Sequence, residues 1–240
     1  MSEHIASTTL DEKMLNRIAK VKVADLADGH QDLGLAPRVA NSTLRPASPM
    51  LRLVGTAVTF HLYLHHGQTE YLEEVTQMYE LGRSVPHAIL VHKNDVPGFT
   101  SFGSGGARVA QSHGYAGCVV AGPIRDTQEL PGIGFPIFGT SINPLSLRMY
   151  KLPYGTSVGL APGHDVDVAG IKISSGDILV GDNDGLIAID PQNFEGVLAE
   201  AEKICNMEAR IFNLLRNGKS FRQILSLDPE LQALGQPKFS

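Results

Sequence analysis

The sequence predicts a single domain of the α/β class that ends in a helical tail. Three observations lead to this fold class. Strand-like and helix-like segments alternate before Pro153, short β segments separated by glycines follow it, and apolar residues recur at helical spacing from Pro191 onward. At 240 residues the chain is long enough to bury a full core. We therefore expect an α/β domain over residues 1–190 and a helical extension over residues 191–240 that packs on the same domain.

The N-terminal segment has the pattern of two helices. Thr9 and Glu12 have the spacing of a capping box, which marks the start of a helix. Apolar residues follow at helical spacing, at Met14, Ile18 and Val21. The pattern predicts an amphipathic helix that begins near residue 9 and a second, short helix over residues 23–27.

The middle of the chain alternates strands with helices. Strands are expected at residues 53–64, 88–92, 117–121 and 136–139. Helices are expected at residues 71–81 and 107–113, with a further short one after residue 126. Gly82 and Gly114 end the first two of these helices. Such alternation predicts parallel strands, and functional residues gather at the carboxyl ends of parallel strands.

Short β segments follow Pro153, and helices end the chain. The β segments are expected at residues 166–168, 171–173, 177–180 and 186–189. The glycines between them predict tight turns and therefore a small antiparallel unit. Residues 191–215 have helical spacing, and residues 221–225 add a last turn.

The composition excludes several classes of partner. The formal net charge is −5 at pH 7 and there is no block of Lys and Arg, so we expect no nucleic-acid surface. No run of apolar residues is long enough to cross a bilayer, and the N-terminus lacks the profile of a signal peptide. We expect a cytoplasmic protein that does not bind membranes. Cys118 and Cys205 lack the spacing of a zinc site and are expected to be reduced thiols.

A glycine-rich turn before one of the helices is the first candidate binding site. Gly103, Gly105 and Gly106 precede the predicted helix, where free backbone N–H groups and the helix dipole attract an anion such as a carboxylate. The alternative is that these glycines only let the chain bend. A dinucleotide-binding fingerprint does not fit, because it needs glycine where Arg108 stands.

Arg125 and Asp126 form the second candidate. They follow the apolar segment VVAGPI directly, which places two opposite charges at the end of a strand. The alternative is an ordinary surface ion pair. The nearby glycine turn favours the functional interpretation.

These motifs resemble the RraA-like, 4-hydroxy-4-methyl-2-oxoglutarate aldolase family. The resemblance rests on Gly103, on Arg125–Asp126 and Glu129 as an RDxxE motif, and on the twenty residues between Ser104 and Arg125. Three further segments are similar to family segments: VGTAVTF (54–60), GFPIFGTSINP (134–144) and GDILVGDNDGLIAID (176–190). The likeness covers most of the chain.

The resemblance implies a swivelling β/β/α fold and a homotrimer or a pair of stacked trimers, with the sites between subunits. It implies that Asp126, with Glu129, holds Mg²⁺ or Mn²⁺ largely through water, a hard-ion site of the kind that oxygen ligands form. Arg125 would contact an oxo-acid substrate, and the N–H groups of Gly105 and Gly106 would hold its carboxylate. The implied reaction is retro-aldol cleavage of a 4-hydroxy-2-oxo acid to pyruvate or a related 2-oxo acid. Decarboxylation of oxaloacetate would give the same pyruvate enolate.

One departure from the family pattern concerns the substrate. The family often has an acidic residue after the first glycine, whereas this chain has Ser104. The pocket around Gly103 and Ser104 is therefore altered and could admit a larger or differently charged substrate. His66 lies near the family's substrate pocket, so we expect it to contact the substrate. A metal site formed by His61, His65 and His66 is less favoured, because adjacent histidines point in different directions.

Several alternatives stay open beside the lyase. Relatives that inhibit a ribonuclease share this fold, so a protein-binding regulator without catalysis is the main rival. Those regulators are expected to lack the aspartate that this chain keeps as Asp126. A methyltransferase has no support, since no motif for a nucleoside methyl donor is present. Asp182 and Asp184 are expected to form a tight turn, and Lys93 to lie at an exposed strand end rather than to form a Schiff base.

Overall fold

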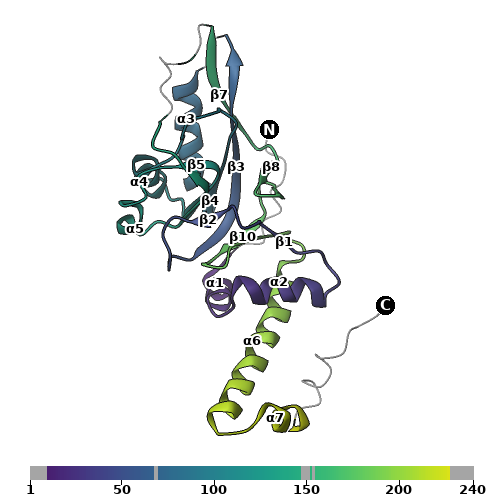
Figure 1. Cartoon of the computed structure of the whole chain (residues 1–240). Coiled ribbons are helices and arrows are strands. Elements are labelled where there is room, and N and C mark those ends of the chain that lie inside the picture. The colour runs from purple at the N-terminus through teal and green to yellow at the C-terminus, as the bar shows by residue number, and fades with distance from the viewer. Residues whose placement is uncertain (1–9, 68–69, 147–151, 153–154, 228–240) are drawn as a thin grey trace.

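The computed structural model describes residues 10–67, 70–146, 152 and 155–227 (Figure 1). Within these residues nine strands form one mixed sheet in the order β1-β11-β10-β3-β4-β5-β6-β2, and β7 also pairs with β3. The strands of this sheet are β1 (Arg38–Val39), β2 (Arg45–Pro46), β3 (Leu53–His66), β4 (Ala88–Asn94), β5 (Gly117–Ile124), β6 (Ile137–Ile142), β7 (Thr156–Pro162), β10 (Ile178–Gly181) and β11 (Leu186–Ile189). A separate antiparallel hairpin consists of β8 (Val166–Val168) and β9 (Ile171–Ile173).

Helices cover one face of the central strands and one end of the sheet. They are α1 (Glu12–Ile18), α2 (Val23–Asp32), α3 (Tyr71–Glu80), the 3₁₀ helix η1 (Leu81–Arg83), α4 (Ser104–Ser112), α5 (Leu130–Ile133), α6 (Phe194–Arg216) and α7 (Phe221–Leu227). Figure 1 shows α3, α4 and α5 on one side of the sheet and β8 on the other, with α1, α2 and α6 below β10.

The central strands are buried on both faces. In β4, Leu90 belongs to the apolar cluster that includes Met78 of α3 and Ala107 of α4. Its neighbour Ile89 belongs to the cluster that includes Val166 and Ile173 of the β8–β9 hairpin. Successive side chains point to opposite faces, so both faces need apolar residues and the strand becomes a continuous apolar run. The predicted parallel pairing of β3, β4, β5 and β6 is confirmed.

The first helix starts later than the sequence pattern predicts. The helix α1 begins at Glu12, and the side chain of Asp11 accepts a hydrogen bond of 2.7 Å from the Met14 N–H. The start near residue 9 is therefore wrong, because Asp11 supplies the cap. Thr9 lies outside the described residues.

The predicted separate antiparallel unit after Pro153 is also wrong in part. Only β8 and β9 form a small sheet of their own. The strands β10 and β11 join the main sheet, where β10 pairs with β3 from Leu53 to Thr56. All four residues of each are buried, because α1, α2 and α6 cover one face of β10 and β11 and the apolar cluster that includes the β8–β9 hairpin covers the other.

The helix α6 packs on the domain only over its first half. Its buried residues are Phe194, Val197, Leu198 and Ala201. They join the cluster that contains Leu26 of α2, and α2 crosses α6 closely at Gly29. Beyond Ala201 the helix extends away from the sheet to α7 (Figure 1).

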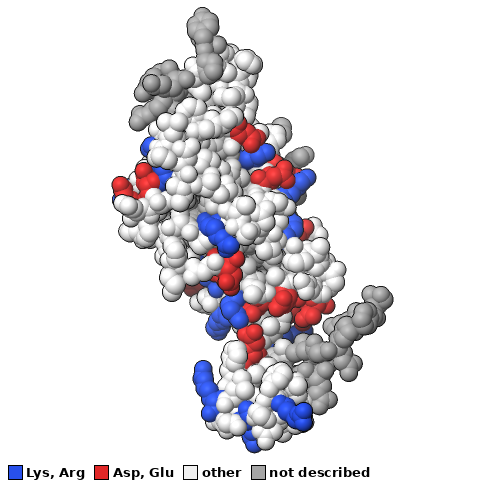
Figure 2. All heavy atoms as spheres, in the orientation of Figure 1, with Lys and Arg blue, Asp and Glu red and all other residues white. Residues whose placement is uncertain are grey.

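Charges are mixed on the surface. Figure 2 shows acidic and basic side chains side by side over the middle of the visible face, whereas only basic side chains appear at its lower end, over α7 and the end of α6. Among the described residues no helix is long and apolar enough to cross a membrane.

Candidate functional site

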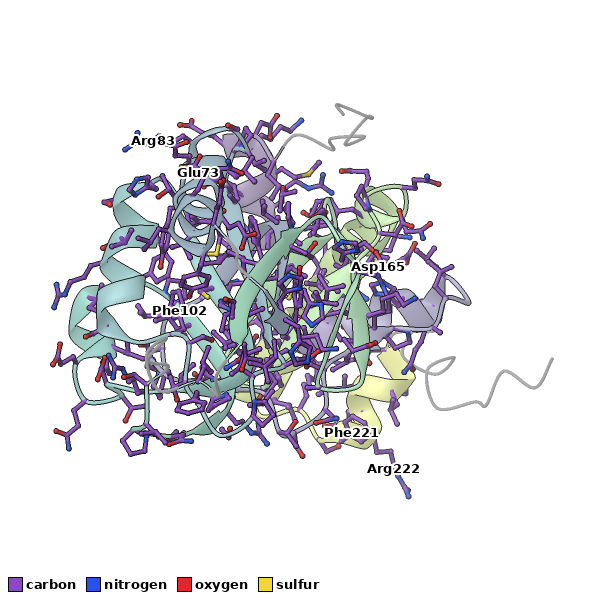
Figure 3. The ribbon with its side chains drawn as sticks, turned by 90° about the horizontal axis from the view of Figure 1, so that it is seen from above. Glu73, Arg83, Phe102, Asp165, Phe221 and Arg222 are labelled. Carbon is purple, nitrogen blue, oxygen red and sulfur yellow. The ribbon has the colours of Figure 1, made fainter. Side chains whose placement is uncertain are left out.

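The candidate site lies where the segment that precedes α4 runs beside the end of β5. Phe102 forms a parallel bridge with Ile124, and the Arg125 N–H donates a hydrogen bond of 3.2 Å to the Phe102 carbonyl. This pairing brings Gly103 and the start of α4 next to Arg125 and Asp126. The helix begins at Ser104 rather than at residue 107, so Gly105 and Gly106, which were expected to precede it, lie in its first turn. Figure 3 shows Phe102 on the helical side of the sheet and Asp165, just before the β8–β9 hairpin, on the opposite side.

Asp126 caps the helix α4 from a distance in sequence. The N-cap residue of α4 is Gly103, which has no side chain to serve as a cap. The Asp126 Oδ2 atom instead accepts hydrogen bonds from the Ser104 N–H at 2.9 Å and the Ser104 hydroxyl at 3.1 Å. A carboxylate at this position is stabilised by the positive end of the helix dipole.

Gly103 is required by the close approach of these two charged residues. Its φ of −161° is ordinary extended backbone that any residue could adopt. A Cβ atom there would lie 2.5 Å from Asp126 Oδ2 and 2.8 Å from Arg125 Cγ. Glycine at this position therefore lets the carboxylate reach the helix N-terminus.

The backbone of Asp126 is in the left-handed region, with φ of 59°. Asp is among the few non-glycine residues that tolerate this region. The Asp126 carbonyl accepts hydrogen bonds from the N–H groups of Glu129 at 2.9 Å and Leu130 at 3.2 Å, which starts α5. Arg125 Nε lies 3.6 Å from Asp126 Oδ2, and about a third of each side chain is exposed. Both side chains are therefore accessible to a small molecule.

A first hollow of about 250 Å³ opens at the N-terminus of α4. Its lining includes Tyr71, Ser101, Gly105, Gly106 and Arg125. Among the described residues the N–H groups of Gly105 and Gly106 have no hydrogen-bond acceptor, and a Cβ atom on Gly105 would meet open space. Two free N–H groups, a helix N-terminus and a guanidinium group together suit a carboxylate.

Two further polar groups of this hollow were missed from the sequence. The Ser101 Oγ atom is buried without a partner in the described part of the chain. Burial, followed by the charge of Glu74, raises the pKa of Tyr71, so its phenol stays protonated and can donate a hydrogen bond. In the sequence, Tyr71 is recognisable only as one of the apolar residues of a predicted helix. No sequence pattern predicts that it lines the same hollow as Ser101.

A second hollow of about 390 Å³ lies on the other side of Arg125. Arg125, Asp126, Gln128 and Glu129 line it. The Oδ1 atom of Asp126 and the exposed carboxylate of Glu129 accept no hydrogen bond from any described residue. These hard oxygen atoms fit Mg²⁺ or Mn²⁺, which bind one or two protein carboxylates and fill their remaining positions with water or substrate. No group of three or more His, Cys, Asp or Glu with metal-binding geometry occurs among the described residues.

Other sequence candidates lie elsewhere. His66 ends β3 opposite Thr156 and lines neither hollow, so its contact with substrate remains a prediction. Asp95 accepts from His61 Nε2 at 2.6 Å and lies 3.2 Å from Lys93 Nζ, so Lys93 is an ion-paired strand-end residue.

The Asp182 side chain forms a turn, as expected. Its Oδ1 atom accepts from the Asp184 N–H at 2.9 Å, and its Oδ2 atom accepts from the Val23 N–H at 3.0 Å. Asp182 therefore connects the β10–β11 turn to the start of α2, and its carboxylate is occupied by backbone donors.

Several known proteins are similar in sequence to this chain. The sequence model of a family described as RraA-like, Aldolase/RraA, matches residues 23–188. A protein of Halalkalibacterium halodurans that bears the name "Putative 4-hydroxy-4-methyl-2-oxoglutarate aldolase" is 30% identical over 186 residues, covering 75% of this chain and 77% of that protein. Protein DlpA of Legionella pneumophila is 22% identical over 232 residues, which are 92% of this chain and 34% of DlpA. A Methanocaldococcus jannaschii protein is 26% identical over 119 residues, 50% of this chain and 54% of that protein. The chain thus spans about a third of the length of DlpA and about half of the length of the M. jannaschii protein.

Solved structures share the fold. A protein from Pseudomonas syringae pv. tomato superposes with a TM-score of 0.70 at 22% identity, covering 90% of this chain and 98% of that chain. RraAS2 of Streptomyces coelicolor is described as an unusual member of the RNase ES inhibitor RraA protein family. It superposes with a TM-score of 0.67 at 22% identity, and the match covers 83% of this chain and 95% of RraAS2. These structures confirm the predicted α/β domain with its C-terminal helix.

Proposed function

Because this chain belongs to the RraA-like family, we propose that it is a divalent-metal-dependent lyase that cleaves a 4-hydroxy-2-oxo acid to pyruvate or a related 2-oxo acid. The observation that carries the proposal is the position of Arg125 between two hollows. One hollow offers the free N–H groups of Gly105 and Gly106, and the other offers the carboxylates of Asp126 and Glu129. Relatives named as aldolases support carbon–carbon cleavage.

Binding of the substrate falls to the first hollow. The N–H groups of Gly105 and Gly106 hold the carboxylate next to the ketone, and Arg125 contacts the ketone oxygen. Gly103 and Ser104 keep the Asp126 carboxylate fixed at the helix N-terminus. Asp126 and Glu129 would hold Mg²⁺ or Mn²⁺, which supplies a further positive charge to the ketone oxygen when bound.

Cleavage breaks the bond between C3 and C4 of the substrate. The C4 hydroxyl loses its proton to water and becomes the carbonyl of the second product, while the electron pair of the broken bond stays on the pyruvate half as an enolate. The enolate then takes up a proton from water at C3 to give pyruvate. Negative charge develops on the oxygen that Arg125 contacts, so this guanidinium group stabilises the transition state more than the ground state. Loss of carbon dioxide from oxaloacetate gives the same enolate, and we propose it as a second reaction.

The test measures pyruvate released from a panel of 4-hydroxy-2-oxo acids and from oxaloacetate, with Mg²⁺ or Mn²⁺ and with a chelator. We expect chelation to abolish release and Asp126→Asn to lower kcat/KM at least about 100-fold, the size of a lost preorganised charge. Asparagine tolerates the left-handed backbone and can still accept from Ser104, so the fold should persist. Glu80→Gln on the exposed end of α3 is the matched control. Full release in the presence of chelator would overturn the metal requirement.

A protein-binding regulator of a ribonuclease is the second candidate, favoured by the fold that the chain shares with RraAS2. A regulator would bind and inhibit a ribonuclease, and would cleave none of the oxo acids in the panel. Asp126→Asn would then leave that inhibition unchanged. Asp126→Asn therefore distinguishes the two candidates: it lowers cleavage of the oxo acids if the protein is a lyase, and it leaves inhibition of the ribonuclease unchanged if the protein is a regulator.

A further inference from the structure

A third hollow of about 400 Å³ adjoins the candidate site. It lies against the paired strands β2 and β6, and Ala47 and Pro49, which follow β2, contribute to its lining. Thr127 and Ile142 line both this hollow and the second one that contains Asp126. The three hollows therefore follow one another along the carboxyl ends of β5 and β6, with Arg125 and then Ile142 at the two junctions.

The third hollow differs in chemistry from the first. Carbon atoms of Pro46, Ala47, Pro49, Ile124 and Ile142 contribute to its lining. The Thr43 hydroxyl is already engaged, because it donates to Asn41 Oδ1 at 2.7 Å. No carboxylate lines this hollow, and its one charged side chain among the described residues is the exposed Arg45. The site thus runs from an anion-binding end to a largely apolar end.

Ile142 marks where this apolar end could bind a ligand. Its side chain is 70% exposed, whereas its register partner Ile124 in β5 is 3% exposed. The backbone of Gly139 lies close to Ile124, since a Cβ atom there would be 2.9 Å from Ile124 Cγ2. An aliphatic group that packs between the buried Ile124 and the exposed Ile142 would remove apolar surface from water, which favours its binding.

We infer that the substrate carries an uncharged aliphatic group on C4, beyond the bond that breaks, and that this group occupies the third hollow, against β2 and β6. The inference rests on the proposed function, because the oxo-acid end must lie at Gly105 and Gly106 for the C4 substituent to reach Ile142. It names the substrate class as 4-alkyl-4-hydroxy-2-oxo acids. The second product is then an aliphatic aldehyde or ketone.

The test compares substrates that differ only in the C4 substituent: hydrogen, methyl, propyl, and a carboxyethyl group that is as long as propyl but charged. We expect kcat/KM to rise about fourfold for each methylene, which corresponds to about 0.8 kcal/mol of apolar burial. The propyl substrate should also exceed the carboxyethyl substrate. A flat series, or a preference for the charged substituent through Arg45, would overturn the inference.

Ile142→Ser tests the wall of the hollow. We expect the ratio of kcat/KM for the propyl substrate to that for the unsubstituted one to fall at least tenfold. The matched control is Leu215→Ser on the outer half of α6, which removes another exposed leucine-sized side chain and should leave the ratio unchanged. An unchanged ratio in Ile142→Ser would contradict the assignment of this wall.

Binding separates failure of this inference from failure of the proposed function. Uncleavable 2-oxo acids with alkyl arms of increasing length, titrated calorimetrically into the wild-type protein, should bind about fourfold more tightly for each methylene. Cleavage of none of the substrates would reject the lyase, yet the affinity series would still support or reject the aliphatic hollow. Affinity that does not depend on arm length would reject the hollow even if cleavage occurs.

Discussion

Asp126 holds its position at a cost to the backbone. Its positive φ is a conformation that non-glycine residues adopt rarely and at a price of order 1 kcal/mol. In return its carboxylate caps α4 and leaves Oδ1 directed to no described protein donor. Such strain concentrates where surrounding structure fixes a functional group. The observed backbone thus supports the role proposed for Asp126 independently of sequence resemblance.

Gly103→Ala should damage this arrangement. The added Cβ would lie 2.5 Å from Asp126 Oδ2, so the turn or the carboxylate must move. We expect a loss of about 1–3 kcal/mol in the free energy of unfolding, as for other overpacked sites, together with a strong loss of activity. Urea denaturation measures the first quantity.

Gly105→Ala is the matched substitution two residues later. Its Cβ would meet nothing within 4 Å, and alanine favours a helix, so the free energy of unfolding should rise by about 0.5–1 kcal/mol. Equal stability changes in the two variants would show that the turn is not closely packed.

His92 should make the protein sensitive to mild acid. Burial, and then the charge of His61, lowers the pKa of His92 to about 4, and both of its ring nitrogens lack partners among the described residues. Between the ordinary pKa of about 6.5 and 4, the unfolded chain takes up a proton that the folded chain does not. Stability is therefore full above pH 6.5 and declines as the pH falls, by about 2 kcal/mol at pH 5.

Replacement of His92 by leucine removes the titrating group. Urea midpoints of His92→Leu at pH 7.5 and pH 5 should differ less than those of the wild type. His164→Gln, which changes an exposed histidine, should keep the wild-type difference. A pH dependence that survives in His92→Leu would assign the acid sensitivity to other groups.

The sequence predicted the chemical groups of the candidate site but not how they contact one another. Gly103, Arg125 and Asp126 were predicted because residue type and spacing reveal a turn and a strand end. The hydrogen bonds from Ser104 to Asp126 span 22 positions and depend on the bridge between Phe102 and Ile124. A tertiary contact of that kind has no local pattern.

At the scale of elements, the strands with two buried faces were the easiest to predict. The buried parts of the parallel strands β3 to β6 are mostly apolar, because helices cover one face and the β8–β9 hairpin covers the other. The strand β7 was missed, since its sequence TSVGLAP contains a glycine and a proline. Gly159 is there because a Cβ would lie 2.7 Å from Tyr63 Cζ. The β conformation of residues 156–162 thus depends on pairing with β3, which no local pattern reveals. The strands β1 and β2 were missed because two residues are too few to show an alternating pattern.

The packing of α2 on α6 depends on Gly29. A Cβ atom at this position would lie 2.8 Å from the Val197 carbonyl oxygen and 3.2 Å from the Ala201 backbone nitrogen. Both are backbone atoms, so Gly29→Ala should push the helices apart and lower the free energy of unfolding by about 1–3 kcal/mol, measured by urea denaturation. Gly196→Ala in α6 is the control, because its Cβ would meet only Leu33 Cδ1 at 3.4 Å. Equal effects of both substitutions would contradict a specific contact at Gly29.

At the scale of the whole molecule, the proposed site is partly exposed to solvent, since about a third of the Arg125 and Asp126 side chains is accessible. All three hollows are surface features of one subunit, and family resemblance implies that a neighbouring subunit completes the site. We propose a homotrimer or a pair of stacked trimers. Analytical ultracentrifugation should give three or six times the subunit mass of 25.8 kDa. A monomer that retains full lyase activity would contradict sites shared between subunits.

The two halves of α6 differ in what maintains their helical conformation. Up to Ala201 the helix is anchored by buried side chains, and from Ile204 to Arg216 no residue is buried in the subunit. In an isolated subunit the outer half packs mainly against the short helix α7, so its backbone amides would open with less free energy and exchange faster than the inner ones, which exchange only when α2 and α6 separate. Slow amide exchange in the outer turns would therefore report that another surface covers them, residue by residue.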